Sequence, residues 1–96
     1  EAKALWQREL ASEERTLGAD HPDTLATVGN LATVLMDQGK LDEAKALRER
    51  ELAGKERALG PHHPDTLRAV NNLANLLNKA GDTTAAAALR ERFGCT

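Results

Sequence analysis

The sequence lacks the features that would indicate a secreted, membrane or nucleic-acid-binding protein. Its single cysteine, Cys95, has no partner for an internal disulfide, so we expect a reducing, cytoplasmic environment. The longest apolar run, Ala85 to Leu89, is far too short to cross a bilayer, and no charged-then-apolar leader opens the chain. A formal net charge of −2 offers no basic field for phosphates. We therefore expect neither nucleic acid nor a membrane as a partner.

The chain has the length and composition of one small globular domain, residues 1–96. Apolar residues make up 41% of the sequence and charged residues 29%, which is ordinary for a folded chain of this kind. Ninety-six residues leave room for one modest hydrophobic core.

One pentapeptide, His-Pro-Asp-Thr-Leu, occurs twice, at residues 21–25 and 63–67. When residues 1–54 are aligned with residues 43–96, 30 of the 54 positions are identical, and the period is 42 residues. A fixed period of about 20 to 50 residues is typical of a solenoid, in which each unit buries its apolar face only against its neighbours. The sequence therefore predicts an array of repeated units.

Each unit is predicted to contain two helices. Pro22 and Pro64 suit a first helical turn, where the missing N–H costs nothing, and an aspartate follows each of them in that turn. Apolar residues then recur at three- and four-residue spacing until Gly39 or Gly81, which suit the left-handed position that ends a helix. We expect five helices in the order B–A–B–A–B: a lone helix B at 1–17, a first repeat at 22–59 (helices 22–37 and 41–59) and a shorter second repeat at 64–93 (helices 64–79 and 83–93).

The residues Asn30-Leu31-Ala32, Leu35, Gly39, Leu41 and Ala44 resemble the pattern of the tetratricopeptide repeat. The usual period of that family is about 34 residues, and a period of 42 with His-Pro-Asp-Thr-Leu is similar to the kinesin light chain subtype, which also occurs in bacterial proteins. The resemblance covers the whole chain. It implies an all-α, right-handed solenoid of antiparallel helix pairs that binds proteins or peptides, without catalytic activity or a cofactor.

The sequence departs from this family at a few positions of helix B. Arg48 and Arg90 stand where the family usually has an aromatic residue, and Glu51 where a small residue is usual. These changes are expected to loosen the packing of helix B. Trp6 occupies the position equivalent to Arg48, so we interpret it as a core residue, with stacking on a ligand as the alternative.

Catalytic and metal-binding patterns are weak. Ser12, the only serine, lies on a charged helix with no histidine near it in sequence, and Cys95 has no second cysteine for a zinc site. His62, His63 and Asp65 suggest a metal site, but His63 repeats His21, which favours a capping role at each helix start. We therefore expect no catalytic residue and no metal ligand.

The polar side of each helix A carries the candidate binding site. Because the helices A of tetratricopeptide folds line the concave surface, the resemblance implies that these side chains contact a bound peptide. Asparagine can both donate hydrogen bonds to a peptide backbone and accept them from it. The cationic side chains of Arg68 and Lys79 would favour an acidic group or a C-terminal carboxylate in the ligand. The alternative is that these residues only face the solvent. Asn30 and Asn72, which occupy equivalent positions in the two repeats, could instead form hydrogen bonds between neighbouring helices. The candidate residues are Asn30 and Thr33 in the first repeat, and Arg68, Asn71, Asn72, Asn75, Asn78 and Lys79 in the second.

We therefore expect a non-catalytic module that binds an extended, possibly acidic peptide in a concave groove. The second hypothesis is a structural self-assembly segment whose exposed ends stack on other copies. The helix at 1–17 has no helix A before it, which predicts a longer array, since end units need polar outer faces. Two repeats and one helix fall below the three usually needed for stability, so the isolated chain is expected to associate through its ends, for example as a homodimer.

Overall fold

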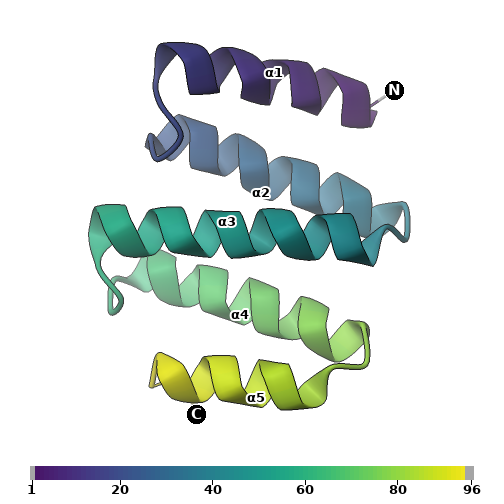
Figure 1. Ribbon diagram of the computed structural model, residues 1–96, viewed down its shortest axis with the longest axis vertical. Coiled ribbons are helices and arrows are strands. Elements are labelled where there is room, and N and C mark those ends of the chain that lie inside the picture. Colours follow the sequence, from purple (N-terminus) through teal and green to yellow (C-terminus); the bar gives the residue numbers. More distant parts are fainter. Residues whose placement is uncertain (1, 95–96) are drawn as a thin grey trace.

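The computed structural model describes residues 2–94, and this part of the chain forms five helices joined by short turns (Figure 1). Each helix packs against the helices next to it in sequence, and the molecule measures 36 × 30 × 14 Å. In Figure 1, α3 passes in front of α2 and α4. The predicted all-α solenoid of antiparallel helix pairs is confirmed. The helices are α1 (Ala2–Thr16), α2 (Pro22–Asp37), α3 (Leu41–Leu59), α4 (Pro64–Lys79) and α5 (Thr83–Arg92).

The repeated pentapeptide builds the start of α2 and of α4. His21 and His63 are the N-cap residues, and the Nδ1 atom of each accepts a hydrogen bond of 3.1 Å from the backbone N–H two residues later. Proline follows as the first helical residue. The threonine of each pentapeptide is fully buried, and its hydroxyl donates to a backbone carbonyl: Thr24 to Gly18 in the preceding turn, and Thr66 to Lys55 in α3. The predicted capping role of the two histidines is confirmed.

Replacing His63 by alanine should lower the free energy of unfolding by about 0.5–2 kcal/mol, because one backbone N–H of α4 loses its partner. His63→Asn should retain most of the stability, since asparagine is a strong N-cap residue. The measurement is chemical denaturation followed by circular dichroism. The neighbouring exposed His62, replaced by alanine, is the matched control, and an equal loss in both alanine variants would contradict the capping role.

The two A helices end at glycines in the left-handed conformation, as the sequence predicts. The φ angles of Gly39 and Gly81 are 78° and 88°. After each glycine the next backbone N–H returns to a carbonyl of the last helical turn, from Lys40 to Leu35 and from Asp82 to Leu77, both at 2.8 Å. This reversal lets helix B fold back antiparallel on helix A.

The hydrophobic core is itself repeated. One cluster, between α1, α2 and α3, contains Leu10, Val28, Leu31, Leu35 and Ala44, and the second contains the residues 42 positions later: Leu52, Val70, Leu73, Leu77 and Ala86. Leu76, on α4, belongs to the first cluster and so joins the two repeats. Phe93 closes the second cluster. Each repeat therefore completes its core with a helix of its neighbour, which is the cooperative arrangement expected of a solenoid.

Across residues 2–94, no helix is both long enough and apolar enough to cross a membrane.

Candidate functional site

The exposed sides of α2 and α4, here called the A face, carry the residues that the sequence singles out. On α4, Arg68, Asn71, Asn75, Asn78 and Lys79 are exposed and Asn72 is half-buried. Residues buried in the core, such as Val70 and Leu77, occupy the opposite side of the helix. The structure therefore brings these six predicted residues together on one polar stripe.

Arg90, which sequence analysis treats only as a departure from the family, reaches this stripe from α5. Its Nη1 donates to Oδ1 of Asn71 at 2.5 Å and its Nη2 to Oδ1 of Asn75 at 3.1 Å. Arginine has donors only, so both amide carbonyls must face it, and both amide NH₂ groups remain for another partner. The guanidinium of Arg90 thus holds both asparagine side chains, and each of them offers a ligand its NH₂ donor but not its carbonyl acceptor.

The same position of the first repeat, Arg48, reaches α2 in the same way. Its Nη2 donates to Thr33 Oγ1 at 3.0 Å, and the hydroxyl of Thr33 donates to the carbonyl of Gly29 at 3.1 Å. Thr33 is therefore already engaged within the protein. Asn30 is exposed and Asn72 half-buried, and within residues 2–94 neither side chain forms a hydrogen bond, so the alternative of a bond between neighbouring helices is not found.

Arg48 and Glu51 form a buried ion pair on α3 that is not predicted above from the sequence. Glu51 is 5% exposed, and its two oxygens accept from Arg48 Nη1 at 3.1 Å and from Lys55 Nζ at 3.2 Å. A Cβ on Gly29 would lie 2.9 Å from Glu51 Oε2, so the missing side chain makes room for the carboxylate. The spacing of Arg48, Glu51 and Lys55 by three and four residues is the signal that could have predicted these pairs.

Trp6 is only partly the core residue that the sequence predicts. Its ring packs against the first hydrophobic cluster but remains half-buried. It also lines a hollow of about 940 Å³ between α1 and α2. Leu5, in the same hollow, is 62% exposed.

The histidines belong to no cluster of candidate metal ligands among the residues that the structure describes. His63 uses Nδ1 for its cap, and residues 2–94 contain no group of three or more His, Cys, Asp or Glu side chains arranged around a metal position. Cys95 lies outside the described residues.

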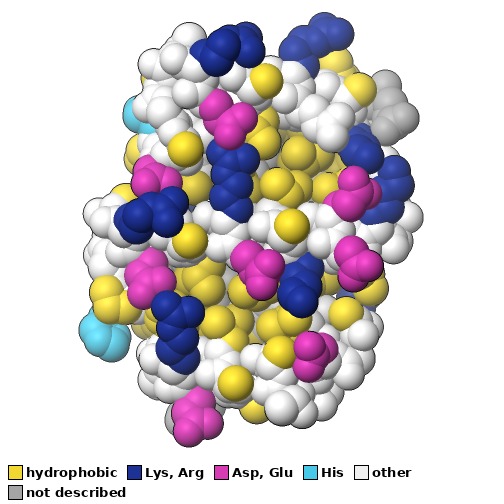
Figure 2. Space-filling model, in the orientation of Figure 1, with side chains coloured by type: hydrophobic (Ala, Val, Ile, Leu, Met, Phe, Trp, Pro, Cys, Tyr) yellow, Lys and Arg dark blue, Asp and Glu magenta, His cyan; other side chains and the backbone are white. Residues whose placement is uncertain are grey.

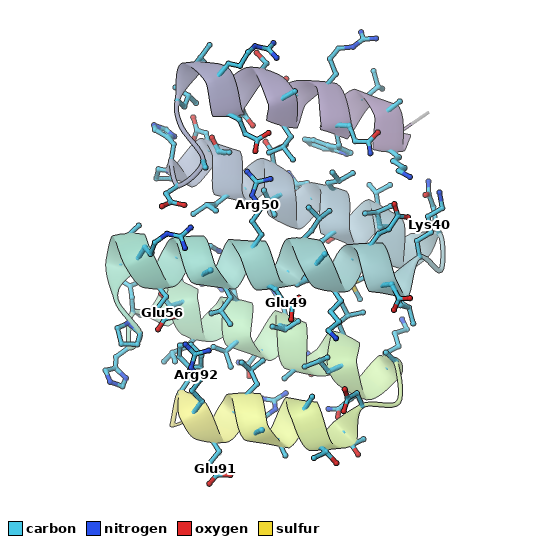
Figure 3. The ribbon with its side chains drawn as sticks, viewed as in Figure 1. Lys40, Glu49, Arg50, Glu56, Glu91 and Arg92 are labelled. Carbon is cyan, nitrogen blue, oxygen red and sulfur yellow. The ribbon has the colours of Figure 1, made fainter. Side chains whose placement is uncertain are left out.

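The opposite surface, formed by α1, α3 and α5 and here called the B face, is crossed by ion pairs between successive helices B. Figure 2 shows charges of both signs over these helices, with apolar side chains in the hollows between them. Figure 3 shows Arg50 pointing from α3 toward α1, and Glu56 and Arg92 pointing toward each other. Arg50 pairs with Glu14, and Arg92 pairs with Glu56 at 3.4 Å. The two pairs are the same contact repeated after 42 residues, so the charges follow the solenoid period.

An ion pair near the turn between α1 and α2 changes the titration of Asp20. Arg57 donates from Nε and Nη2 to the two carboxylate oxygens, at 2.9 and 2.8 Å, and this hydrogen bonding lowers the pKa of Asp20 below its ordinary value. A lowered pKa in the folded state means that the pair stabilises the protein above the usual pKa of aspartate and loses its effect as the pH falls through the lowered value.

Arg57→Ala should therefore return the pKa of Asp20 toward that of a free aspartate, which an NMR titration of the carboxyl carbon would measure. Arg15→Ala, at the equivalent position of α1, should leave the titration unchanged. A pKa of Asp20 that is the same with and without Arg57 would contradict the pairing in solution.

The family model of the tetratricopeptide repeat matches residues 23–92. A crystal structure of a Podosopora anserina protein described as a kinesin light chain, with nearly identical TPR-like repeats, is 29% identical, with a TM-score of 0.84, over 96% of this chain and 44% of that one. A single-substitution variant of that protein is 30% identical, with a TM-score of 0.85, over 96% of this chain and 43% of that one. No curated protein matches the chain.

The chain belongs to the tetratricopeptide repeat family. Its repeats are of the kinesin light chain type, as the 42-residue period and the solved structures agree. It spans less than half the length of those solved chains. Folds of this family generally mediate protein–protein interaction and scaffolding.

Proposed function

We propose that the chain is a non-catalytic binding module that holds an extended peptide against the A face of α4. The observation that carries this proposal is the pair Asn71 and Asn75, whose amide NH₂ groups are left as donors because Arg90 occupies both carbonyls. Two oriented amide donors one turn apart fit carbonyl oxygens of a peptide backbone better than they fit other donors.

The charge of this surface favours an acidic ligand. Arg68 and Lys79 are exposed at either end of the stripe, and Arg90 lies beside its centre. The carboxylate of Asp65 lies 3.4 Å from Arg68, and both side chains are well exposed, so water screens this pair strongly. Carboxylate groups of a ligand would thus meet donors and positive charge along the stripe.

The length of the stripe limits the ligand. Arg68 and Lys79 are eleven residues apart, which is about 16 Å along a helix at about 1.5 Å per residue. An extended chain advances about 3.3 Å per residue, so four or five ligand residues span the stripe. A short acidic segment is the ligand that this surface fits.

The test is selection of a random peptide library on the 96-residue chain, followed by titration of a selected peptide. Selected peptides should be enriched in Asp and Glu. Asn71→Ala combined with Asn75→Ala should weaken binding by about 1–3 kcal/mol, roughly 5- to 150-fold, because ligand carbonyls lose their donors. Gln7→Ala, an amide on a different helix, is the control. Unchanged affinity in the folded double variant would exclude this stripe as the site.

A further inference from the structure

An arginine of helix B reaches helix A in both repeats, and one half of this contact is the same in each. Nη2 of Arg48 donates to Oγ1 of Thr33 at 3.0 Å. Nη2 of Arg90 donates to Oδ1 of Asn75 at 3.1 Å, and both of these residues lie 42 positions after their counterparts. The two arginines therefore hold equivalent positions, and any difference between them comes from the residues around them.

The other guanidinium nitrogen, Nη1, meets a carboxylate in the first repeat and a neutral amide in the second. Nη1 of Arg48 donates to the buried carboxylate of Glu51 at 3.1 Å. This carboxylate lies against Gly29, where an added Cβ would be 2.9 Å from Oε2. Nη1 of Arg90 donates instead to Oδ1 of Asn71, which stands at the position equivalent to Gly29. The first repeat thus contains an example of a carboxylate bound to this arginine.

Arg90 carries a positive charge that the described residues do not neutralise. Phe93 takes the position of Glu51 and lies buried in the second hydrophobic cluster. Within residues 2–94, Arg90 forms no ion pair, and its hydrogen bonds go to two neutral amide carbonyls. A guanidinium has five N–H donors, so three remain for another partner. Its side chain is half-buried, whereas Arg48 is only 9% exposed.

We propose that Arg90 determines the specificity of the peptide site by binding one carboxylate side chain of the ligand. The inference rests on the proposed function, because it identifies the group of the site that recognises an acidic residue. The carboxylate accepts from the remaining N–H groups of Arg90 and from the NH₂ group of Asn71 or Asn75, as charge-assisted hydrogen bonds. The first repeat offers no such site, since Glu51 already occupies Arg48.

Arg90 is better suited to this role than the two exposed cations of the stripe. Arg68 and Lys79 are surrounded by water, which screens their attraction for a carboxylate, and each must lose side-chain freedom to bind one. Arg90 is half-buried and its guanidinium is already fixed by two hydrogen bonds, so its attraction is screened less and less freedom is lost on binding. Arg90 therefore determines which residue of the peptide is acidic.

The test compares two blocked tetrapeptides, Gln-Glu-Gln-Gln and Gln-Gln-Gln-Gln, titrated into the 96-residue chain and followed by NMR. The unmodified chain should bind the glutamate peptide about tenfold more tightly, as a charge-assisted hydrogen bond replaces a neutral one. Arg90→Gln should reduce this ratio to about threefold or less, the remainder coming from the exposed cations. Arg92→Gln is the matched control, because it removes the same charge from α5 on the B face, and it should leave the ratio within about twofold.

A second readout in the unmodified chain does not depend on the folding of any variant. The Nε–H resonance of Arg90 should shift on addition of the glutamate peptide and not of the glutamine peptide, while the resonances of Arg48 and Arg92 stay in place. A purely structural Arg90 would show no such difference.

The outcomes separate this inference from the proposed function. If Asn71→Ala with Asn75→Ala weakens both peptides while Arg90→Gln leaves their ratio unchanged, or if Arg90 Nε–H does not respond to the carboxylate, Arg90 does not determine the specificity and the stripe remains the site. If neither peptide binds the unmodified chain, both the proposed function and this inference are wrong.

Discussion

Replacing Leu76 by alanine is expected to lower the free energy of unfolding by about 2–5 kcal/mol. The side chain is 0% exposed and lies in the hydrophobic cluster formed mainly by α1, α2 and α3, although Leu76 itself belongs to α4. Its removal leaves a cavity at the junction of the two repeats. Urea denaturation followed by far-ultraviolet circular dichroism measures the loss.

The chain provides a matched control for this substitution. Val34 occupies the equivalent position of α2, 42 residues earlier, and is only half-buried among residues 2–94. Val34→Ala should therefore cost clearly less, about 1 kcal/mol or below, since part of the side chain is already in water. Similar losses at the two positions would show that Leu76 does not join the repeats.

Replacing Glu51 by alanine is expected to cost about 3–5 kcal/mol, the second large effect. Glu51 is 5% and Arg48 9% exposed, and Arg48 Nε already has no hydrogen-bond partner among the described residues. Without the carboxylate, a guanidinium remains buried with Thr33 as its single partner. Breaking a buried pair from one side is strongly destabilising for this reason. Thermal and chemical denaturation would both register the change.

Two companion variants separate the charge from the packing. Arg48→Met combined with Glu51→Met keeps the volume and removes both charges, and it should be neutral or stabilising, because the desolvation of two ions is no longer required. Lys55, which is only partly buried, can then extend its ammonium group to water. Glu9→Ala, at the exposed equivalent position of α1, should change stability by less than about 0.5 kcal/mol. If the double variant is as unstable as Glu51→Ala, the two side chains are required for packing, and the loss of stability in Glu51→Ala does not come from an unpaired buried charge.

The local features were predicted well because each depends on neighbouring residues. His21, Pro22 and Gly39 act within one turn of the helix that they begin or end, so their spacing alone indicates the boundaries. The 42-residue period then indicates the stacking of helices, since equivalent residues must bury equivalent faces. The position of the polar residues of α4 on one side of the helix is also predictable, because it follows from helical periodicity alone.

The partners of those polar residues could not be predicted in this way. Arg90 meets Asn71 and Asn75, and Arg48 meets Thr33, across 15 to 19 residues and between two different helices. From the sequence, both arginines are expected to loosen the packing of helix B, whereas in the structure they bridge helix B to the polar side of helix A. A side chain as long as arginine has several directions open to it, and only the packing angle of the two helices selects one.

The helices, their order and the repeated core can be predicted from the sequence alone, because they follow from caps, periodicity and a period that recurs in the same chain. The pairing of the charges depends on the tertiary fold. It neutralised Glu51 with Arg48 and Lys55, used the carbonyls of Asn71 and Asn75 for Arg90, and left Arg8 and Arg15 without an ion-pair partner within residues 2–94. The physical reason is that apolar burial depends on which face a residue lies on, whereas an ion pair or hydrogen bond depends on distances of a few ångströms between groups far apart in sequence.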